Sequence, residues 1–499
     1  MSICLGIDFG TSTNVVTYWD ANKKTAVPVP LGKYGMPNVF PNVIYYESAT
    51  NKIVGDDAVA KGKQDPTNAV FAIKRRLESV DFKQAVPKLG LSLSSEDIAT
   101  DIFGWIKKSV EEKYGGQPVD GVVISVPFAF QHRERKRIER AAQRAGLKVL
   151  GLIEEPVAAA LSFGLIERAT RGKNEKILVF DLGGGTFDVT IFDFQKQSDR
   201  QFAIKVITTD GATKLGGIDI DDAIVDNLLG MLDKQFPDYN LDTRDSKVQE
   251  KEAFMLRQQA IEMKEILSDD EEADLIFTSS ISDEFLLDDV ITRDDLIGWL
   301  RSFMTKIEDV LNSALDDADL EPKDIDRIIM VGGTSNIPAV NELVREYFGK
   351  EPEQVRQLDL MVGEGAGIYC GLKYVEKSLE CNIAVGVSRD IGINRNGRFK
   401  LMLARNTLYG TPSAVEIITL NRLGQKDISV PIVQGNQTVN SKVATIDVPI
   451  DVQNKLSGNR IGVRLNTDKN SGTILYELYD VSSNGKAGAL LKSDKAGEE

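Results

Sequence analysis

The sequence predicts an α/β region of two related lobes followed by an all-β module, and three observations support this division. Apolar runs typical of strands alternate with helical patterns from the N-terminus to about residue 375. After about residue 389, short runs with a period near two follow one another, with hairpin turns at Asn396-Gly397 and Asn484-Gly485. With 499 residues, the chain is also too long to form a single core.

The elements of the first region can be placed in chain order. Dense apolar runs at 121–128 and 176–182 suit strands that are covered on both faces. Between them, Arg133–Gly146 predicts a helix that ends at its glycine. We expect two more helices over Asp245–Leu267 and Arg293–Leu315. In the second of these, four bulky residues recur at helical spacing and should face the core: Trp299, Phe303, Ile307 and Leu311.

Composition excludes several functional classes. The chain has 75 acidic and 60 basic residues, a net charge of −15 that argues against sequence-independent binding of nucleic acid. The only histidine is His132, and Cys4, Cys370 and Cys381 form no CxxC pair, so we expect neither a zinc site nor a histidine-based catalyst. We find no secretion signal and no apolar run of the about 20 residues that span a membrane. These features predict a cytoplasmic protein that binds neither nucleic acid nor membrane.

Two glycine-rich turns share one plan. In Val179–Phe194 and in Leu5–Val16, an apolar strand reaches an acid (Asp181 or Asp8), a turn with glycine follows, and a second apolar strand begins. This repetition indicates a duplicated lobe. Glycines let a turn approach a ligand closely, and successive backbone N–H groups then bind an anion. The turns are not Walker loops, because GxxxxGK[ST] is absent and a strand follows the glycines. Facing each other, they would clasp the phosphates of one nucleotide.

The acids in these turns predict a metal ion. A bare carboxylate about 4 Å from a phosphate oxygen would repel it by roughly 1–4 kcal/mol. Asp8 and Asp181 are therefore explained best by Mg²⁺ or its water shell lying between them and the phosphates. The structural alternative, tight hairpins with acids as turn formers, explains either stretch alone better than it explains the pair. Two weaker glycine turns lie at Leu215–Asp219 and Val331–Pro338, and a helix beginning after Gly333 would hold another phosphate.

The chain resembles the DnaK-type, seventy-kilodalton heat-shock chaperones, which share a superfamily with actin and the sugar kinases. The resemblance rests on GIDFGTSTNVV, FAIKRRL, ISVPFAF, EEPVAAALSFGL, FDLGGGTFDV, LGGIDID and VGGTSNIP in this order. It covers the chain except for the family's C-terminal helical lid, which has no counterpart here. It implies an actin-like nucleotide-binding domain at 1–377 with two lobes of duplicated ribonuclease-H-like topology, a linker at 378–388, and a β-sandwich peptide-binding domain at 389–499.

The family hydrolyses ATP slowly with Mg²⁺ and K⁺, and the resemblance implies a role for each matching residue. Lys74 would stabilise charge on the γ-phosphoryl group, where an exposed surface lysine is the alternative, and Glu155 would complete the network of water and metal. Asp8 and Asp181 would position the metal ions. The residues implied to hold the nucleotide are Gly10, Thr11, Ser12, Thr13, Gly183, Gly184, Gly185, Thr186, Gly216, Gly217, Lys264, Ser268, Gly332, Gly333 and Asn336.

In the β module, Phe399, Ile418 and Ile428 fall where the family lines its peptide groove with apolar side chains. Each of the three could equally be ordinary core. Arg135 matches an arginine that faces the interdomain linker in the family. Its neighbours on the same predicted helix are explained most simply as a solvated face: Arg133, Lys136 and Arg137.

The sequence departs from the family at two places. The adenine site normally has a glutamate, an arginine or aliphatic residue, and a second arginine, but those positions hold Ile261, Glu265 and Asn336. Loss of a stacked arginine would remove about 0.5–2 kcal/mol of cation–π attraction. The linker, usually several leucines and an acid, aligns with four residues that question standard interdomain coupling: Asn382, Ile383, Ala384 and Val385.

The resemblance implies an ATP-dependent molecular chaperone, active in protein folding and the stress response, that binds exposed hydrophobic peptide segments. A J-domain co-chaperone and a nucleotide exchange factor would be its partners. The alternative from another class is a nucleotide-switched regulatory protein that binds one dedicated partner. An actin-like filament protein is disfavoured because the β module has no role in it, and a sugar kinase is disfavoured because no second-substrate site is evident.

Overall fold

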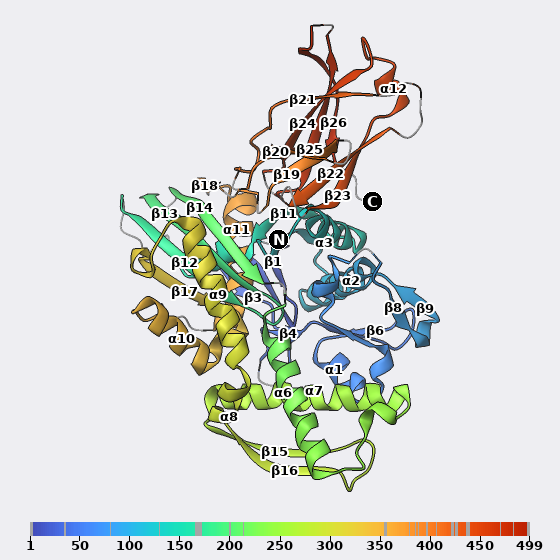
Figure 1. Cartoon of the computed structure of the whole chain (residues 1–499), viewed down its shortest axis with the longest axis vertical. Coiled ribbons are helices and arrows are strands. Elements are labelled where there is room, and N and C mark those ends of the chain that lie inside the picture. The colour runs from blue at the N-terminus through green and yellow to red at the C-terminus, as the bar shows by residue number, and fades with distance from the viewer. Residues whose placement is uncertain are drawn as a thin grey trace.

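The first lobe of the chain is built on a mixed sheet (Figure 1). The strands β1 (Ile3–Phe9) and β2 (Thr13–Asp20) form an antiparallel hairpin, and β3 (Thr25–Pro28) extends it. On the other side of β1, β10 (Val119–Val126) and β11 (Val149–Glu154) run parallel to it. The computed structural model describes residues 3–33, 36–79, 81–128, 130–164, 172–198, 201–212, 214–353, 357–378, 380–384, 386–387, 389–395, 398–405, 407–420, 424, 428–435, 440–469, 471–482 and 484–496.

The second lobe repeats this arrangement. The strands β12 (Asn174–Leu182) and β13 (Phe187–Ser198) form the hairpin, and β14 (Gln201–Ala212) extends it. On the other side of β12, β17 (Arg327–Val331) runs parallel, while β18 (Glu380–Ala384) joins the far edge. The order β17-β12-β13-β14 matches β10-β1-β2-β3 of the first lobe. The predicted duplication is therefore confirmed.

Two helices cross between the sheets, α4 (Glu155–Ser162) and α11 (Met361–Cys370). They approach each other closely because small residues line the contact. A Cβ at Gly365 would overlap the backbone of Ala158, so only glycine fits there. The crossing fixes the distance between the lobes and thus the width of the space between them.

Other elements decorate the lobes. On the first lobe, α2 (Ser95–Lys113) begins at a capping box formed by Ser94 and Asp97 and packs on α3 (His132–Arg144). The remaining strands of this lobe are β4 (Phe40–Pro41), β5 (Val43–Tyr46), β6 (Lys52–Val54), β7 (Ala69–Phe71), β8 (Gln84–Val86) and β9 (Leu91–Leu93), with helix α1 (Asp56–Gly62). The second lobe adds α6 (Gly217–Gln235), α7 (Ser246–Asp269), the hairpin of β15 (Glu272–Thr278) and β16 (Leu286–Thr292), and α10 (Pro338–Phe348).

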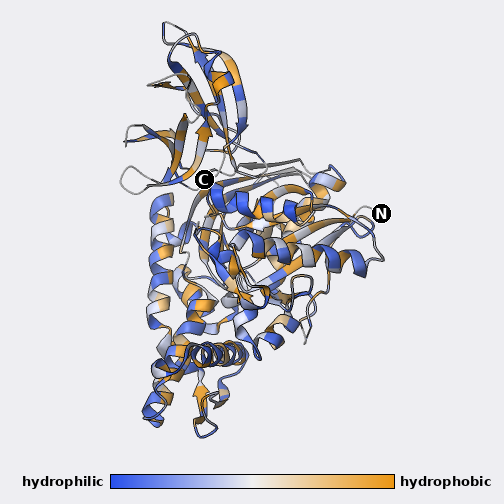
Figure 2. Ribbon diagram, turned by 90° about the vertical axis from the view of Figure 1, so that its right-hand side faces the viewer, coloured by the Kyte–Doolittle hydropathy of each residue, from blue (hydrophilic) through white to orange (hydrophobic). Residues whose placement is uncertain are grey.

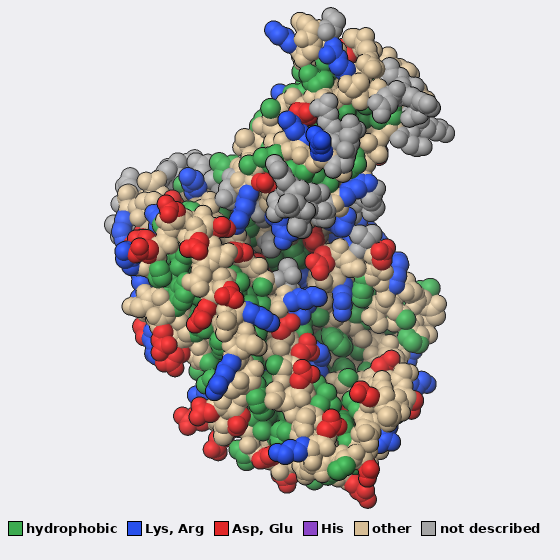
Figure 3. Space-filling model, in the orientation of Figure 1, with side chains coloured by type: hydrophobic (Ala, Val, Ile, Leu, Met, Phe, Trp, Pro, Cys, Tyr) green, Lys and Arg blue, Asp and Glu red, His purple; other side chains and the backbone are tan. Residues whose placement is uncertain are grey.

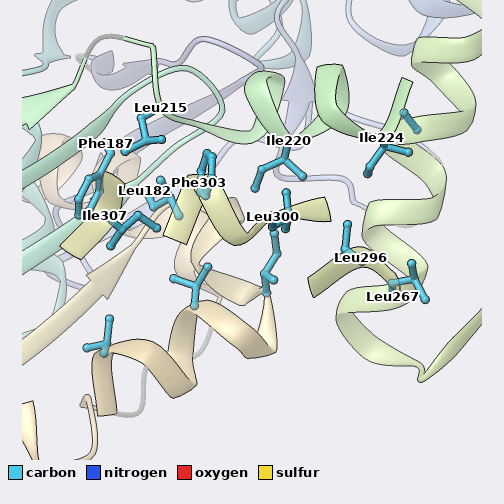
Figure 4. Packing of buried hydrophobic residues seen from close by; sticks show 14 of the residues in the cluster. Leu182, Phe187, Leu215, Ile220, Ile224, Leu267, Leu296, Leu300, Phe303 and Ile307 are labelled. Atoms are coloured by element: carbon cyan, nitrogen blue, oxygen red, sulfur yellow. The ribbon is translucent and has the colours of Figure 1, made fainter. Parts of the chain in front are cut away.

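The helix predicted over Arg293–Leu315 is in fact two helices, α8 (Arg293–Trp299) and α9 (Arg301–Ala318). They meet at Leu300, whose backbone departs from α-helical angles with ψ at 4°. The change of direction lets Leu300 and Phe303 both reach the core of the second lobe (Figure 4). The helix predicted over Asp245–Leu267 is confirmed as α7.

The last part of the chain is a β sandwich, as predicted, at one end of the molecule (Figure 1). Its two four-stranded sheets share one hydrophobic core. The predicted turn at Asn484-Gly485 joins β25 to β26 with Gly485 at a φ of 78°, whereas Asn396-Gly397 lies outside the described residues. The elements are β19 (Ile391–Arg395), β20 (Arg398–Leu403), β21 (Glu416–Thr419), β22 (Ser429–Gly435), β23 (Asn440–Asp447), α12 (Ile450–Gln453), β24 (Arg460–Thr467), β25 (Ile474–Val481) and β26 (Ala487–Lys495).

Each lobe and the β sandwich have their own cluster of buried hydrophobic residues. Many helices mix hydrophilic and hydrophobic residues along their length, as expected where one face packs inward (Figure 2). Acidic side chains are spread over the lobes below the β sandwich (Figure 3), in keeping with the net charge of −15. Within the described ranges, no helix is long and apolar enough to cross a membrane.

Candidate functional site

The two glycine turns face each other across the interlobe space. A Cβ at Gly185 would lie 2.5 Å from the Thr11 side chain, and one at Gly184 would overlap the Ser12 hydroxyl. Side chains at these two positions would therefore push the loops, and with them the lobes, apart. The sequence uses glycine where the two hairpins approach most closely.

Most of the predicted phosphate and metal residues line one cavity between these loops. The cavity also receives three residues that the sequence did not indicate, from the segment before and within α11: Leu358, Asp359 and Val362. The predicted residues in its lining are Asp8, Gly10, Thr11, Ser12, Thr13, Lys74, Glu155, Asp181, Gly183, Gly184, Gly185, Thr186, Gly332 and Gly333. The predicted residues Gly216, Gly217, Lys264, Ser268 and Asn336 lie outside this lining.

Lys74 forms the central ion pair of the cavity. Its Nζ lies 2.6 Å from Glu155 Oε1, and its side chain is only 6% exposed, so the surface-lysine alternative is wrong. Burial alone would lower the pKa of Lys74, but the carboxylates of Glu155 and Asp8 outweigh it and raise that pKa. Lys74 lies in a 3₁₀ turn that follows Ala72, a non-glycine residue with a positive φ of 55°. This strained residue sets the direction in which the turn enters the cavity.

Three aspartates lie close to this pair, Asp8 partly buried and Asp181 and Asp188 buried. Burial raises the pKa of Asp8 to about 6, although Lys74 opposes the shift, and the Ser125 hydroxyl donates to Asp8 Oδ1 at 2.7 Å. Burial and Glu155 raise the pKa of Asp181 well above its usual value. Asp188, directly opposite Asp181 in the hairpin, has its pKa raised to about 7, again by burial and then by Glu155. This excess of carboxylates over cations favours a further positive ion.

The donor set fits Mg²⁺ held mainly through water and phosphate. Among the described residues, no group of three or more acids, cysteines or histidines is placed to bind a metal directly. Mg²⁺ is commonly bound by one or two carboxylates together with waters and substrate phosphates. Asp8 and Asp181, both in the cavity lining, match that pattern.

The predicted nucleoside residues surround the far side of the second glycine loop. Lys264 Nζ pairs with Asp221 Oδ1 at 2.5 Å, and the Ser268 hydroxyl donates to Lys264 O at 2.8 Å within α7. The α6 N-terminus contacts the loop directly, since Gly217 N donates to Gly183 O at 3.0 Å. The predicted helix N-terminus after Gly333 is wrong. A 3₁₀ turn, Gly333–Asn336, follows instead, and α10 begins only at Pro338, because proline favours the first turn of a helix.

Sequence reasoning missed several residues of the site. Arg75 donates to Gly185 O through Nε (3.0 Å) and Nη2 (2.5 Å) and pairs with Asp219, so it ties the first lobe to the second loop. Its place beside Lys74 was a signal for Arg75, and the hairpin register was a signal for Asp188. Nothing in the sequence around Asp359 indicated its place in the cavity.

Helix α3 lies between the first lobe and the β sandwich. Arg135 is buried there, and its Nη1 donates to Glu154 Oε1 at 3.0 Å and to Ser471 O of the sandwich at 3.2 Å. The solvated-face prediction is wrong for Arg137, which is buried and donates to the carbonyls of Leu77 and Ser79. The prediction failed because an arginine can satisfy several backbone carbonyls inside the protein.

Other contacts join the sandwich to the lobes. Arg405, after β20, pairs with Asp317 of α9 at 2.9 Å and donates to Thr209 O of β14 at 2.6 Å. Arg133 donates to Lys442 O at 2.7 Å. In the predicted linker, β18 pairs with β14, while Val385 and the side chains of 382–384 lie outside the described residues.

The predicted peptide-groove residues lie in the β sandwich as partly buried side chains. Phe399 packs over Gly392 of the neighbouring strand. Ile418 and Ile428 pack against the sandwich core. Their role in peptide binding stays a prediction.

Two duplicated lobes with facing glycine hairpins define an actin-like ATPase fold, here followed by a β sandwich. The model of the family described as "Hsp70 protein" matches residues 4–471. The chain is 31% identical over 443 residues to the Chaperone protein DnaK of Thermotoga petrophila, covering 87% of this chain and 71% of the relative. It is 30% identical over 442 residues to that of Thermosipho melanesiensis, covering 87% and 70%. The chain belongs to the Hsp70 family.

Proposed function

We propose that the chain is an ATP-dependent molecular chaperone that binds exposed hydrophobic peptide segments under control of ATP hydrolysis. The observation that carries the proposal is the single cavity that joins both glycine loops to Lys74, Glu155, Asp8 and Asp181. Family membership supports it, since the DnaK proteins are chaperones by name. We further propose that it works in the cytoplasm with a J-domain co-chaperone and a nucleotide exchange factor.

The residues of the cavity suit phosphoryl transfer to water. The backbone N–H groups and hydroxyls of the two loops would hold the β- and γ-phosphates, and Asp8 and Asp181 would hold the water shell of Mg²⁺ and K⁺. Lys74 would neutralise charge that develops on the transferred group. Glu155, held by Lys74 at 2.6 Å, would orient the attacking water.

The contacts between the sandwich and both lobes support a route from nucleotide to peptide. Arg135 contacts the sandwich from the first lobe, and Arg405 contacts the second lobe from the sandwich. A change in the angle between the lobes therefore cannot leave both contacts intact. Closing the lobes on ATP would change how the sandwich is held, and with it the groove.

The Arg405 contact provides a test of this coupling. We expect Arg405→Ala to weaken docking of the sandwich by about 1–2 kcal/mol, because an exposed ion pair and a charged hydrogen bond are lost. The ability of ATP to accelerate release of a bound hydrophobic peptide should fall roughly fivefold to thirtyfold. Stopped-flow release of a fluorescent peptide measures this. Arg460→Ala, which removes a sandwich arginine bonded to Ser482 O within the module, is the matched control. Unchanged release in Arg405→Ala would contradict this coupling route.

The altered nucleoside residues favour the second candidate, a nucleotide-switched regulator with one dedicated partner. Glu265 and Asn336 stand where the family pattern has other residues around the base, and a chain with a weakened base site would follow a different nucleotide cycle. A library of hydrophobic peptides separates the two functions. Binding of many sequences with ATP hydrolysis stimulated by them supports the chaperone, and binding of none supports the regulator.

A further inference from the structure

His132, the one histidine of the chain, lies in the contact between α3 and the β sandwich. It is 2% exposed. Its Nδ1 accepts a hydrogen bond from the backbone N–H of Ile474, the first residue of β25, at 2.8 Å. Its Nε2 lies 3.3 Å from the carbonyl oxygen of Ala496, just after β26. One imidazole thus satisfies a backbone donor and a backbone acceptor of the sandwich.

This pair of bonds defines the protonation state of the ring. A nitrogen that accepts a hydrogen bond carries no proton, whereas a nitrogen that faces a carbonyl donates one. His132 is therefore the neutral tautomer with its proton on Nε2. A charged imidazolium would direct an Nδ1–H against the Ile474 N–H, losing one bond and leaving a buried donor without an acceptor.

The charged groups around the ring are mostly cations. Arg133, Arg135 and Lys136 come from its own helix, and Lys495 approaches from β26. Glu139 pairs with both lysines, at 3.2 Å from Lys136 and 3.3 Å from Lys495. Glu154 of β11 pairs with Arg135 at 3.0 Å, and burial raises the pKa of Glu134, two residues along α3. Tyr409 and Gln434 line the other side of the small cavity beside His132. Burial and the charges of Lys136, Lys495 and Arg133 disfavour a positive charge on the ring. The Ala496 carbonyl alone among these neighbours favours one.

We propose that His132 makes docking of the β sandwich onto the first lobe dependent on pH, so that acidification releases the sandwich. The docked arrangement accepts only the neutral ring, whereas the undocked helix exposes the ring to water and accepts both forms. The inference goes beyond the proposed function, and its test holds the nucleotide state constant, so that changes of docking caused by nucleotide do not contribute.

The sign of the dependence follows from linkage. Burial first, and then Lys136, lower the pKa of His132 in the docked arrangement from 6.5 to about 3. Docking therefore keeps its full strength above pH 6.5 and loses it as the pH falls towards 3. Because each pK unit is a factor of ten, the docking equilibrium at pH 5.5 should be about tenfold weaker than at pH 7.5.

The whole chain can be tested by small-angle X-ray scattering and by NMR of its single imidazole. We expect the ratio of extended to compact wild type to rise reversibly about tenfold from pH 7.5 to pH 5.5, with the imidazole signal changing in the same range. His132→Asn, whose amide oxygen can accept from Ile474 N–H but cannot titrate, should stay compact throughout. His132→Lys, which carries a fixed charge, should be extended at every pH.

Several results would overturn the proposal. Equal expansion of wild type and His132→Asn on acidification would assign the effect to other groups. An extended wild type at pH 7.5, or an imidazole that titrates near 6.5 with no change in shape, would show that the ring does not control docking. The NMR measurement needs no variant, so misfolding of a substituted chain does not remove the test. None of these measurements requires ATP hydrolysis. They can therefore be interpreted even if the chain does not hydrolyse ATP and the proposed function fails.

Discussion

Replacing Lys74 by alanine is expected to reduce ATP hydrolysis at least a hundredfold. Lys74 is the one cationic side chain among the described residues of the cavity lining, and it faces Asp8, Glu155 and Asp181. Removing one group that stabilises developing charge in a water-excluded site typically costs a factor of about 10² to 10³. Asp181→Asn should have a comparable effect through the metal ions, and Thr186→Ala a smaller one. Single-turnover hydrolysis of prebound ATP measures the chemical step directly.

The control for this experiment must separate catalysis from stability. Lys74→Ala leaves Glu155 buried without its partner, and breaking a buried ion pair can cost about 3–5 kcal/mol of folding free energy. The double substitution Lys74→Met with Glu155→Gln removes both charges, so it should unfold close to the wild-type temperature while remaining inactive. Lys108→Ala, at an exposed position on α2, is the matched surface control. Single-turnover rates of Lys74→Ala within twofold of wild type would contradict the proposed role.

The nucleoside side of the site carries the second large prediction, which is unusually weak binding of ATP. Ile261 cannot accept a hydrogen bond from the ribose, and Asn336 cannot stack as an arginine does. Losing both should cost about 1–3 kcal/mol, a tenfold to hundredfold loss of affinity. Glu265 and Asp359 add two carboxyl groups, both with a pKa raised by burial, to the region that holds the Lys264–Asp221 pair. We therefore also expect poor discrimination between ATP and GTP.

Restoring the family pattern should reverse this effect. We expect Ile261→Glu with Asn336→Arg to tighten ATP binding at least tenfold, measured by calorimetry with ATP and GTP. The gain should be larger for ATP, because the change concerns the base and ribose and leaves the phosphate loops intact. Glu262→Gln, an exposed neighbour on α7, controls for the change of charge. Nanomolar affinity in the unmodified chain, or no gain from the pair, would show that other residues build the base pocket.

Local patterns predicted the fold and most residues that line the cavity, because the causes of these features are local. An apolar strand, an acid and glycines in order define each hairpin, and duplication then requires the two hairpins to face each other. The two sheets share one strand order, as duplication requires, and the two loops approach as closely as their glycines allow. Asp188 follows from the same logic, since antiparallel register places it opposite Asp181.

What the sequence could not predict depends on contacts distant along the chain. Leu300 interrupts a helix because the lobe core lies on two sides of that segment. Arg137 is buried because carbonyls near residue 78 happen to meet α3, and helical periodicity alone assigned it to solvent. Asp359 reaches the cavity only because α11 crosses between the sheets. The contacts of His132 depend on the start of β25 and the end of β26, which are more than 300 residues away along the chain.

Isothermal titration of the unmodified chain with ATP and with ADP, each with Mg²⁺ and with or without a hydrophobic peptide, tests the central claim most directly. The claim is that one nucleotide binds between the two hairpins and controls peptide binding by the sandwich. We predict one Mg²⁺-dependent nucleotide site, of weak affinity, and a peptide affinity that is lower with ATP than with ADP. Absence of nucleotide heat up to millimolar ATP, or peptide affinity identical in the two nucleotides, would contradict it.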